Sequence, residues 1–290
     1  MDYVLHIAVL IGIYTTLSVS LDLLVGHTGL LSLAHAAFYG LGAYTSALFA
    51  VQLGAPFPVG VLAGMVMAAL VSLIVSLPSL RLHEDYFVIA TFGFQMIIFS
   101  IFNNWIELSR GPLGIPGIPQ PVILGWAVQS HFEFVFLSTL LASFAFLVVG
   151  LITTSPFGRV LRAIREDEVF AQAMGKNTVR FKITAFAVSA MLAASAGSLY
   201  AHYVTYIDPT SFTVMESILV ISMVIIGGAG SLWGPMVGAI VLVMLPEALR
   251  FLGLPSSIAA NLRQIVYGVL LVVMMMIRPG GLMGRYGFGR

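Results

Sequence analysis

Uncharged stretches recur along the whole sequence, and many of them reach the length of about 20 residues that an α-helix needs to cross a bilayer. Only 9% of the 290 residues are charged, against roughly a quarter in an ordinary soluble domain. The formal net charge of +1 gives no field that would attract an acidic or basic partner. We therefore expect an all-α, polytopic membrane protein, and we exclude a soluble enzyme and a nucleic-acid-binding protein.

Charge clusters and breaks at glycine and proline divide the chain into about nine predicted spans. They cover residues 3–21, 29–52, 57–77, 86–106, 134–154, 183–203, 216–226, 232–249 and 261–277. Counts of eight or ten stay open, because broken segments can be re-entrant and 121–131 can form a short half-helix. We expect a single transmembrane domain over 1–290 with one polar segment at 155–182. The first span lacks the basic region of a signal peptide and is expected to be retained.

Lysine and arginine residues in the loops predict the orientation, because cytoplasmic loops of membrane proteins are enriched in them. If the polar segment is cytoplasmic and nine spans alternate, ten basic residues lie inside and three outside. The inside group is Arg81, Arg159, Arg162, Arg165, Lys176, Arg180, Lys182, Arg278, Arg285 and Arg290, and the outside group is Arg110, Arg250 and Arg263. This ratio predicts a cytoplasmic C-terminus and, with nine spans, an N-terminus outside.

The polar segment 155–182 has the signals of a capped helix. Ser155 is a favoured N-cap residue, Pro156 is tolerated in the first turn, and Gly175 suits the left-handed conformation that closes a helix. One helix is expected between these signals, with an apolar stripe made of Val160, Ile164, Ala171 and Met174. Three interpretations stay open: a loop kept soluble by its charges, a helix at the membrane interface, and a helix that docks on a partner.

The sequence holds no motif for ATP hydrolysis or metal-dependent catalysis. Asn177 follows Gly175-Lys176, and Phe170 stands where a phosphate-binding loop needs its first glycine. No two of the 6 histidines lie four residues apart and there is no cysteine, so neither a helical metal site nor a cysteine nucleophile is expected. Acidic residues are missing from the centres of the spans, which argues against an ion-coupled carrier, although backbone-only ion sites keep that alternative open.

Four ionisable residues come close to membrane depth. Asp22, Glu216 and Glu247 lie near predicted span ends and are expected to be solvated at the interface. His35 lies deeper, and a neutral imidazole bonded to a backbone carbonyl explains it as well as a ligand contact does.

Two glycine-rich breaks, 26–29 and 227–230, resemble each other. Unwound segments at corresponding places in two halves of a chain point to the substrate site of a transporter, but an ordinary turn between helices explains each break equally well. The residues expected to interrupt the helices are Gly26, Gly29, Gly227, Gly228 and Gly230.

Five segments in a fixed order resemble the LivM-type permeases of branched-chain amino acid ABC importers. They are GHTGLLSLAHAAFYGLGAY (26–44), RLHEDYFVIATFGF (81–94), RGPLGIPGIP (110–119), SPFGRVLRAIREDEVFAQAMG (155–175) and GGAGSLWGPMVGA (227–239). Each segment alone is weak, whereas the ordered set is specific to this group. The resemblance implies a multi-pass protein of the bacterial or archaeal cytoplasmic membrane that forms half of a translocation pathway for leucine, isoleucine and valine.

The resemblance also implies partners. They are a homologous LivH-type permease, two cytoplasmic ABC ATPases that hold ATP and magnesium, an extracytoplasmic substrate-binding protein, and membrane lipid. The chain itself is expected to be a transport subunit without a cofactor, and no additional N-terminal domain is expected. Similar permeases serve urea, amides and other amino acids, so these substrates and a self-sufficient secondary carrier stay as alternatives. A membrane-embedded enzyme ranks last.

In this family the polar segment would be the coupling helix, which carries ATPase motion into the spans. The candidate coupling residues are Arg159, Arg162, Ala163, Arg165, Glu166, Asp167 and Gly175. The candidates for lining the substrate path are polar or aromatic residues on predicted spans, namely Ser32, His35, Tyr39, Tyr44, Thr91 and Gln95.

Overall fold

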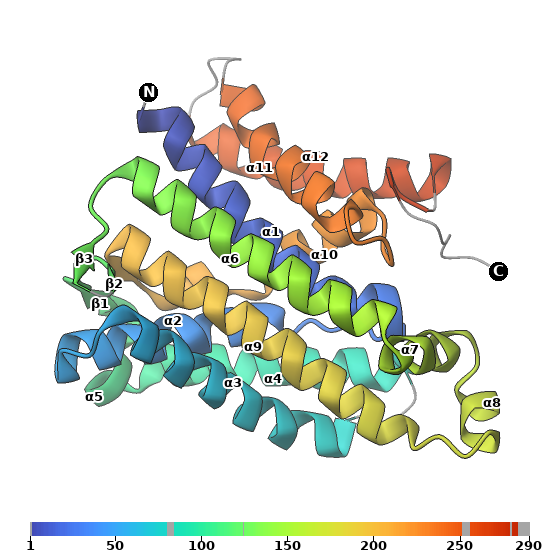
Figure 1. Ribbon diagram of the computed structural model, residues 1–290. Helices are drawn as coiled ribbons and strands as arrows, with labels where there is room; N and C mark the ends of the chain where they lie inside the picture. Colours follow the sequence, from blue (N-terminus) through green and yellow to red (C-terminus); the bar gives the residue numbers. More distant parts are fainter. Residues whose placement is uncertain (1, 80–83, 124, 251–255, 279, 284–290) are drawn as a thin grey trace.

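The computed structural model describes residues 2–79, 84–123, 125–250, 256–278 and 280–283, and helices make up most of it (Figure 1). Six helices are long and apolar enough to cross a membrane: α1 (Asp2–Thr28), α2 (His35–Leu53), α3 (Phe57–Ser79), α4 (Glu84–Asn104), α6 (His131–Thr154) and α9 (Thr178–Val204). Three further apolar helices are α10 (Val214–Gly227), α11 (Gly234–Arg250) and α12 (Ser256–Ile277). The prediction of an all-α, polytopic helical bundle is confirmed.

Short elements connect the long helices at the end of the bundle opposite α7 (Pro156–Glu166) and α8 (Glu168–Ala173) (Figure 1). They are α5 (Ile106–Ser109), η1 (Gly111–Leu113), η2 (Pro209–Phe212), and two antiparallel pairs, β1 (Ile115–Pro116) with β4 (Tyr206–Ile207) and β2 (Val122–Ile123) with β3 (Trp126–Ala127). The stretch 121–131, weighed as a half-helix, therefore forms a hairpin instead. Gly125 supplies the positive φ, +87°, that favours a turn there.

The largest differences between the predicted spans and the helices lie at the first break. The first helix continues beyond residue 21 to Thr28, and the second begins at His35 instead of 29. Gly29 takes a left-handed conformation with φ of +75°, so the chain leaves α1 there and runs without helical structure to Ala34.

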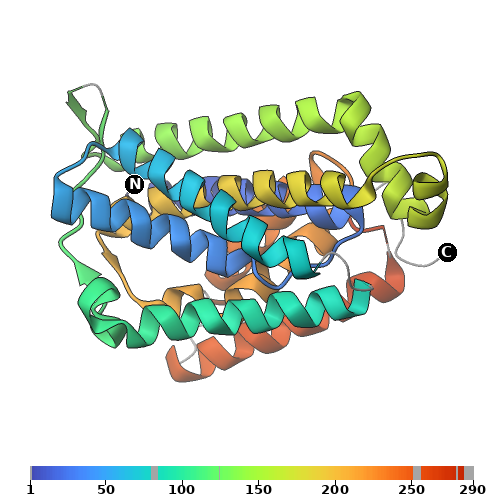
Figure 2. The same cartoon turned by 90° about the horizontal axis from the view of Figure 1, so that it is seen from below.

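Helices α1 and α9 form the centre of the bundle (Figures 1 and 2). Helix α1 packs against α6, α9, α10 and α11, while α9 packs against α2 and α3. The α2–α9 pair approaches closely because Gly197 lies against the backbone of Tyr39 and Gly42 lies against the backbone of Ala194. In lipid, where burial of apolar surface does not drive helices together, such contacts between small residues stabilise the bundle.

Candidate functional site

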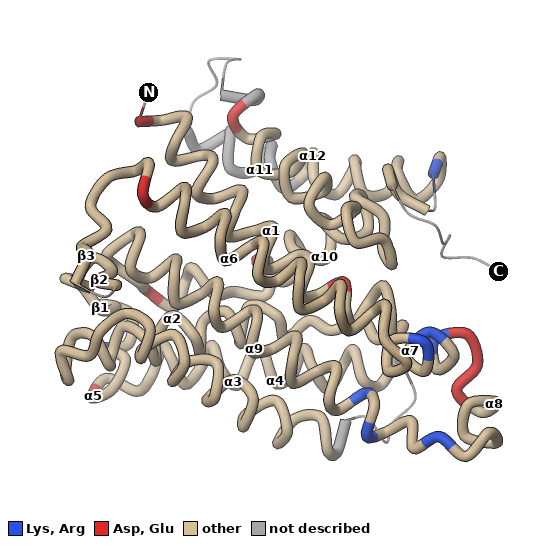
Figure 3. Tube along the Cα trace, in the orientation of Figure 1, with Lys and Arg blue, Asp and Glu red and all other residues tan. Residues whose placement is uncertain are grey.

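Most of the lysine and arginine residues drawn in Figure 3 gather at one end of the bundle, around α7, α8 and the beginning of α9, where three acidic residues join them. Ser155 caps α7 by accepting a hydrogen bond from the Gly158 amide, as its residue type predicts. The prediction of one continuous helix is wrong. Asp167 has an extended backbone, and its carboxylate accepts a hydrogen bond of 2.9 Å from the Phe170 amide. Asp167 thus ends α7 and caps α8. Gly175, with φ of +77°, follows α8 in the predicted left-handed conformation.

The break at Asp167 also changes which apolar residues face the bundle. Ile164 and Ala171 are buried as expected, whereas Val160 is only half-buried and the Met174 side chain is 66% exposed. Leu161 is fully buried and takes the inward position predicted for Val160. The break accounts for Met174, which lies after it, whereas Val160 lies before it on α7, whose buried face is formed by Gly158, Leu161 and Ile164.

The outer side of α7 and α8 carries a shallow groove of about 340 Å³. Its lining consists of Pro156, Arg159, Val160, Ala163, Phe170, Ala171, Met174 and Lys176. Two of the candidate coupling residues, Arg159 and Ala163, therefore share this groove. Phe170 was missed, and Met174 was expected on the apolar stripe and not in a groove. The signal for both was an apolar side chain in a segment otherwise rich in charge.

Arg165 points in the opposite direction, towards the bundle. Its guanidinium group donates a hydrogen bond to the Gly26 carbonyl at the first glycine break, and its aliphatic stem lies beside Gly29. The candidate coupling residue Arg165 and the candidate breaks Gly26 and Gly29 thus form one contact region. α7 is attached directly to the end of α1.

Asp22 connects the first glycine break to the second. Its Oδ1 accepts a hydrogen bond of 2.8 Å from the Gly230 amide, which lies 208 residues away in the sequence. The side chain of Asp22 is buried, so the expectation that it is solvated at the interface is wrong. Helix α1 continues past Asp22, which places the carboxylate inside the bundle, where it needs such a partner. We call Asp22, Gly26, Gly230 and Arg165 the glycine junction.

The other two breaking glycines, Gly227 and Gly228, lie at the end of α10. The Met283 amide donates a hydrogen bond of 2.8 Å to the Gly227 carbonyl, and Gly228 has a positive φ of +114°. The segment after α12 therefore packs on the second break.

The remaining coupling candidates lie on other faces of the segment. Glu166 is exposed, and Arg162 faces a cavity beside His27. Lys182 is buried and forms an ion pair of 2.6 Å with Glu168, a contact that sequence reasoning missed. It holds the beginning of α8 against α9.

The substrate-path candidates lie around the beginning of α2, in the interior of the chain. His35 Nε2 lies 2.8 Å from Ser20 Oγ and 3.1 Å from the Leu17 carbonyl oxygen, so the predicted backbone contact is present. Gln95 Oε1 accepts a hydrogen bond of 2.6 Å from the Ala37 amide. The first amides of a helix have no partner within it, and here other helices supply one.

Further side chains complete this arrangement. The Leu33 amide donates to Thr91 Oγ1, the Ala34 amide to Ser32 Oγ and the Ala36 amide to Ser217 Oγ. Ser217 was not among the candidates, since its neighbours in α10 gave no reason to single it out.

Tyr39 and Tyr44 pack in an aromatic cluster with Phe212. The hydroxyl groups of both tyrosines are buried without a hydrogen-bond partner in the described part of the chain. All six path candidates are buried within this single chain. That they line a path stays a prediction.

Glu216, also expected to be solvated at the interface, is half-buried in the structure. Its Oε1 accepts a hydrogen bond of 2.5 Å from the Tyr14 hydroxyl, which joins α10 to α1. No group of three or more histidine, aspartate or glutamate side chains that could hold a metal occurs within the described residues.

Comparison with known proteins identifies relatives that match most of the chain. The LivM permease of the high-affinity branched-chain amino acid transport system of Escherichia coli is 35% identical, over 96% of this chain and 69% of the relative. A probable LivM of Methanocaldococcus jannaschii is 28% identical over 75% of this chain and 65% of the relative. The LivH permease of Salmonella typhimurium is 23% identical over 94% of this chain and 91% of the relative. No solved structure is a significant match.

A family model described as the permease component of branched-chain amino acid transport systems matches residues 3–275. The match includes the glycine junction, the α7–α8 segment and all the apolar helices except the first residue of α1 and the last two of α12. This chain therefore belongs to the family of branched-chain amino acid transport permeases.

Proposed function

We propose that the chain is one of two homologous permease subunits of an ABC importer, and that this importer carries leucine, isoleucine and valine. The observation that carries the proposal is the 35% identity to LivM along 96% of the chain. Matches to LivH as well as LivM support a homologous partner, since both names belong to permeases of such transport systems. In this proposal an extracytoplasmic binding protein delivers the substrate, and ATP and magnesium bind to two ATPase subunits. The chain itself binds no cofactor and is no enzyme.

We further propose that α7 and α8 form the coupling segment and that their groove receives an ATPase subunit. The groove combines exposed apolar side chains with the flanking cations Arg159 and Lys176, a composition suited to a protein contact with an acidic rim. The link from Arg165 to Gly26 supports transmission from this segment into α1. The same coupling segment also contains the candidate residues Arg162, Glu166, Asp167 and Gly175.

The proposed orientation places the α7 end of the bundle in the cytoplasm. The basic residues of the segment support this side, since such residues are enriched in cytoplasmic loops. The chain after α12 lies at the same end, because Met283 and Arg162 line one cavity. A cytoplasmic C-terminus and nine spans follow in this proposal, with the N-terminus outside. The predicted inside residues Arg81, Arg285 and Arg290 lie outside the described part of the chain.

Uptake by reconstituted liposomes tests the proposal. The full chain, the homologous permease, the ATPases and the binding protein are reconstituted, and labelled leucine is followed with and without internal ATP. We expect uptake that needs ATP and all the subunits. Uptake by this chain alone without ATP would show a self-sufficient carrier. Uptake of urea or a short amide without uptake of leucine would contradict the proposed substrates.

Replacing Phe170 by alanine is expected to weaken coupling. An apolar anchor at a protein interface contributes about 2 kcal/mol, which corresponds to more than tenfold in affinity. We therefore expect substrate-stimulated ATP hydrolysis at limiting ATPase concentration to fall at least about tenfold. The matched control is Val169→Ala, because Val169 is also exposed but does not line the groove. Equal activity of the two variants would contradict the assignment of the groove.

A further inference from the structure

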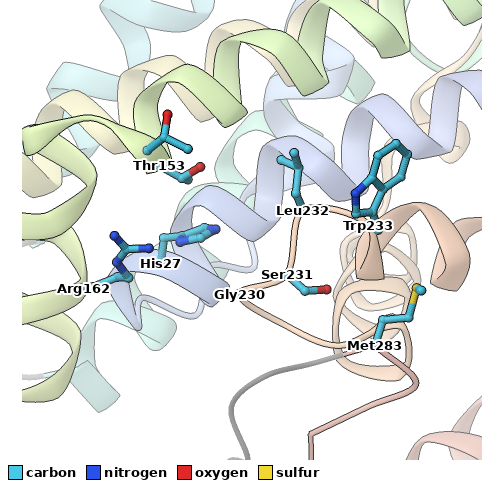
Figure 4. A pocket seen from close by; sticks show the side chains of 9 residues that line it. His27, Thr153, Arg162, Gly230, Ser231, Leu232, Trp233 and Met283 are labelled. Carbon is cyan, nitrogen blue, oxygen red and sulfur yellow. The ribbon is translucent and has the colours of Figure 1, made fainter.

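A cavity of about 580 Å³ lies beside the glycine junction, between the ends of α1 and α6, the middle of α7 and the loop that precedes α11 (Figure 4). Its lining consists of His27, Thr153, Thr154, Arg162, Gly230, Ser231, Leu232, Trp233 and Met283. Figure 4 shows His27 and Arg162 on one side, and Leu232, Trp233 and Met283 on the other. The cavity therefore has a polar half and an apolar half.

The polar half presents unused hydrogen-bonding capacity. His27 is 5% exposed, and its Nε2 atom is buried without a hydrogen-bond partner in the described part of the chain. Asp22 Oδ2 lies 3.6 Å from this atom, beyond hydrogen-bond distance, while the other carboxylate oxygen, Oδ1, accepts the hydrogen bond from the Gly230 amide. Arg162 pairs with no carboxylate among the described residues. A guanidinium group and an imidazole side by side favour an anion, and phosphate oxygens suit both donors.

The apolar half continues into a surface that a bilayer would cover. Trp233 is 60% exposed and packs on Phe146 of α6, with 5.3 Å between the ring centroids. Beyond it, α6 exposes Phe144, Leu147 and Leu151 along its length. Tryptophan is enriched at the depth of lipid headgroups, and α6 ends at Thr154 beside the cavity. The polar half thus lies at headgroup depth and the apolar half points along the hydrocarbon region.

We propose that this cavity binds the headgroup of an anionic phospholipid. The phosphate contacts Arg162 and His27, and the acyl chains lie along Trp233 and the exposed face of α6. Basic pockets between helices at the cytoplasmic side of a membrane bind anionic headgroups in this way. A free phosphate shares the polar contacts but gains nothing from the apolar half. The proposal rests on the membrane-spanning arrangement and is independent of what the chain transports.

The test measures lipid retained by the full chain in neutral detergent, using native mass spectrometry. Phosphatidylglycerol and phosphatidylcholine with identical acyl chains are titrated separately, and inorganic phosphate is added as a competitor. We expect preferential retention of phosphatidylglycerol, with an affinity about tenfold lower in Arg162→Gln, because the variant loses one charge-assisted hydrogen bond. Trp233→Ala is expected to weaken the retention of both lipids, because it removes an apolar contact that their identical acyl chains share.

The matched control is Arg159→Gln, which removes one positive charge three residues earlier on α7 but lines the outer groove instead of the cavity. It is expected to retain phosphatidylglycerol as the unaltered chain does. His27→Gln provides a second probe of the polar half if Arg162→Gln fails to fold. Equal retention by the Arg162 and Arg159 variants, or no preference for phosphatidylglycerol, would overturn the proposal. Full competition by millimolar inorganic phosphate would show a free-anion site instead.

Discussion

Replacing Gly197 by valine is expected to destabilise the fold more than most single changes in the long helices. Gly197 lies where α9 crosses α2, and a Cβ atom there would overlap the Tyr39 carbonyl and approach the Ala43 amide to 3.0 Å. Overpacking a well-packed core costs about 1–3 kcal/mol, and the upper end applies when the obstructing atoms are backbone. We expect a lower melting temperature by circular dichroism and less monodisperse protein after extraction.

Gly93→Val is the matched control for this prediction. Gly93 also lies inside a long helix, α4, but apart from its chain neighbours and the adjacent helix backbone no atom lies within 4 Å of a Cβ built on it. Both substitutions lose the same backbone freedom and add the same side chain, so the difference between them reports the helix crossing. Equal melting temperatures for the two variants would contradict the packing that the structure shows.

Replacing Asp22 by leucine is expected to abolish most of the ATP-dependent uptake. The change removes the acceptor of the Gly230 amide, and an unpaired buried amide costs about 1–3 kcal/mol. It also removes the link between the two glycine breaks, the first of which is attached to α7 through Arg165. We expect uptake per folded transporter to fall about fivefold or more, since about 1 kcal/mol, the lower end of that range, corresponds to about fivefold.

Asp22→Asn separates the two contributions of this residue. The asparagine side chain keeps a carbonyl oxygen that can accept the Gly230 hydrogen bond, but it carries no charge. We expect this variant to retain most of the uptake, measured in the same liposomes with equal amounts of folded protein. Normal uptake by the leucine variant would show that the link has no role. Loss in both variants would show that the negative charge itself is required.

The helices could be predicted from the sequence because their signals are local. The uncharged stretches have the length of a membrane span, and Ser155 and Gly175 mark the ends of the polar segment by their backbone preferences. The break at Asp167 was missed because three acidic residues stand together. Any of them fits an exposed helix face, and only tertiary packing decides which becomes a cap.

The arrangement of the candidate site could not be predicted, because it depends on contacts between residues far apart in the sequence. The resemblance between the two glycine breaks was visible, but their meeting through Asp22 joins residues 208 positions apart. Asp22 looked like the end of a span because charge normally ends one, and the structure instead buries it with a backbone partner. For the same reason the polar residues near α2 looked like a path lining, while many of them satisfy backbone amides.

The hydrogen bonds at the beginning of α2 restrict how the neighbouring helices can move. Its first amides are bonded to Gln95 of α4 and Ser217 of α10, so sliding any of these three helices along another would break buried hydrogen bonds with no water to replace them. The three helices therefore form one stiff unit at that depth. Any rearrangement during a transport cycle would then be concentrated where the backbone is unwound, at 29–34 and 228–233, and these two short stretches would act as the chain's hinges.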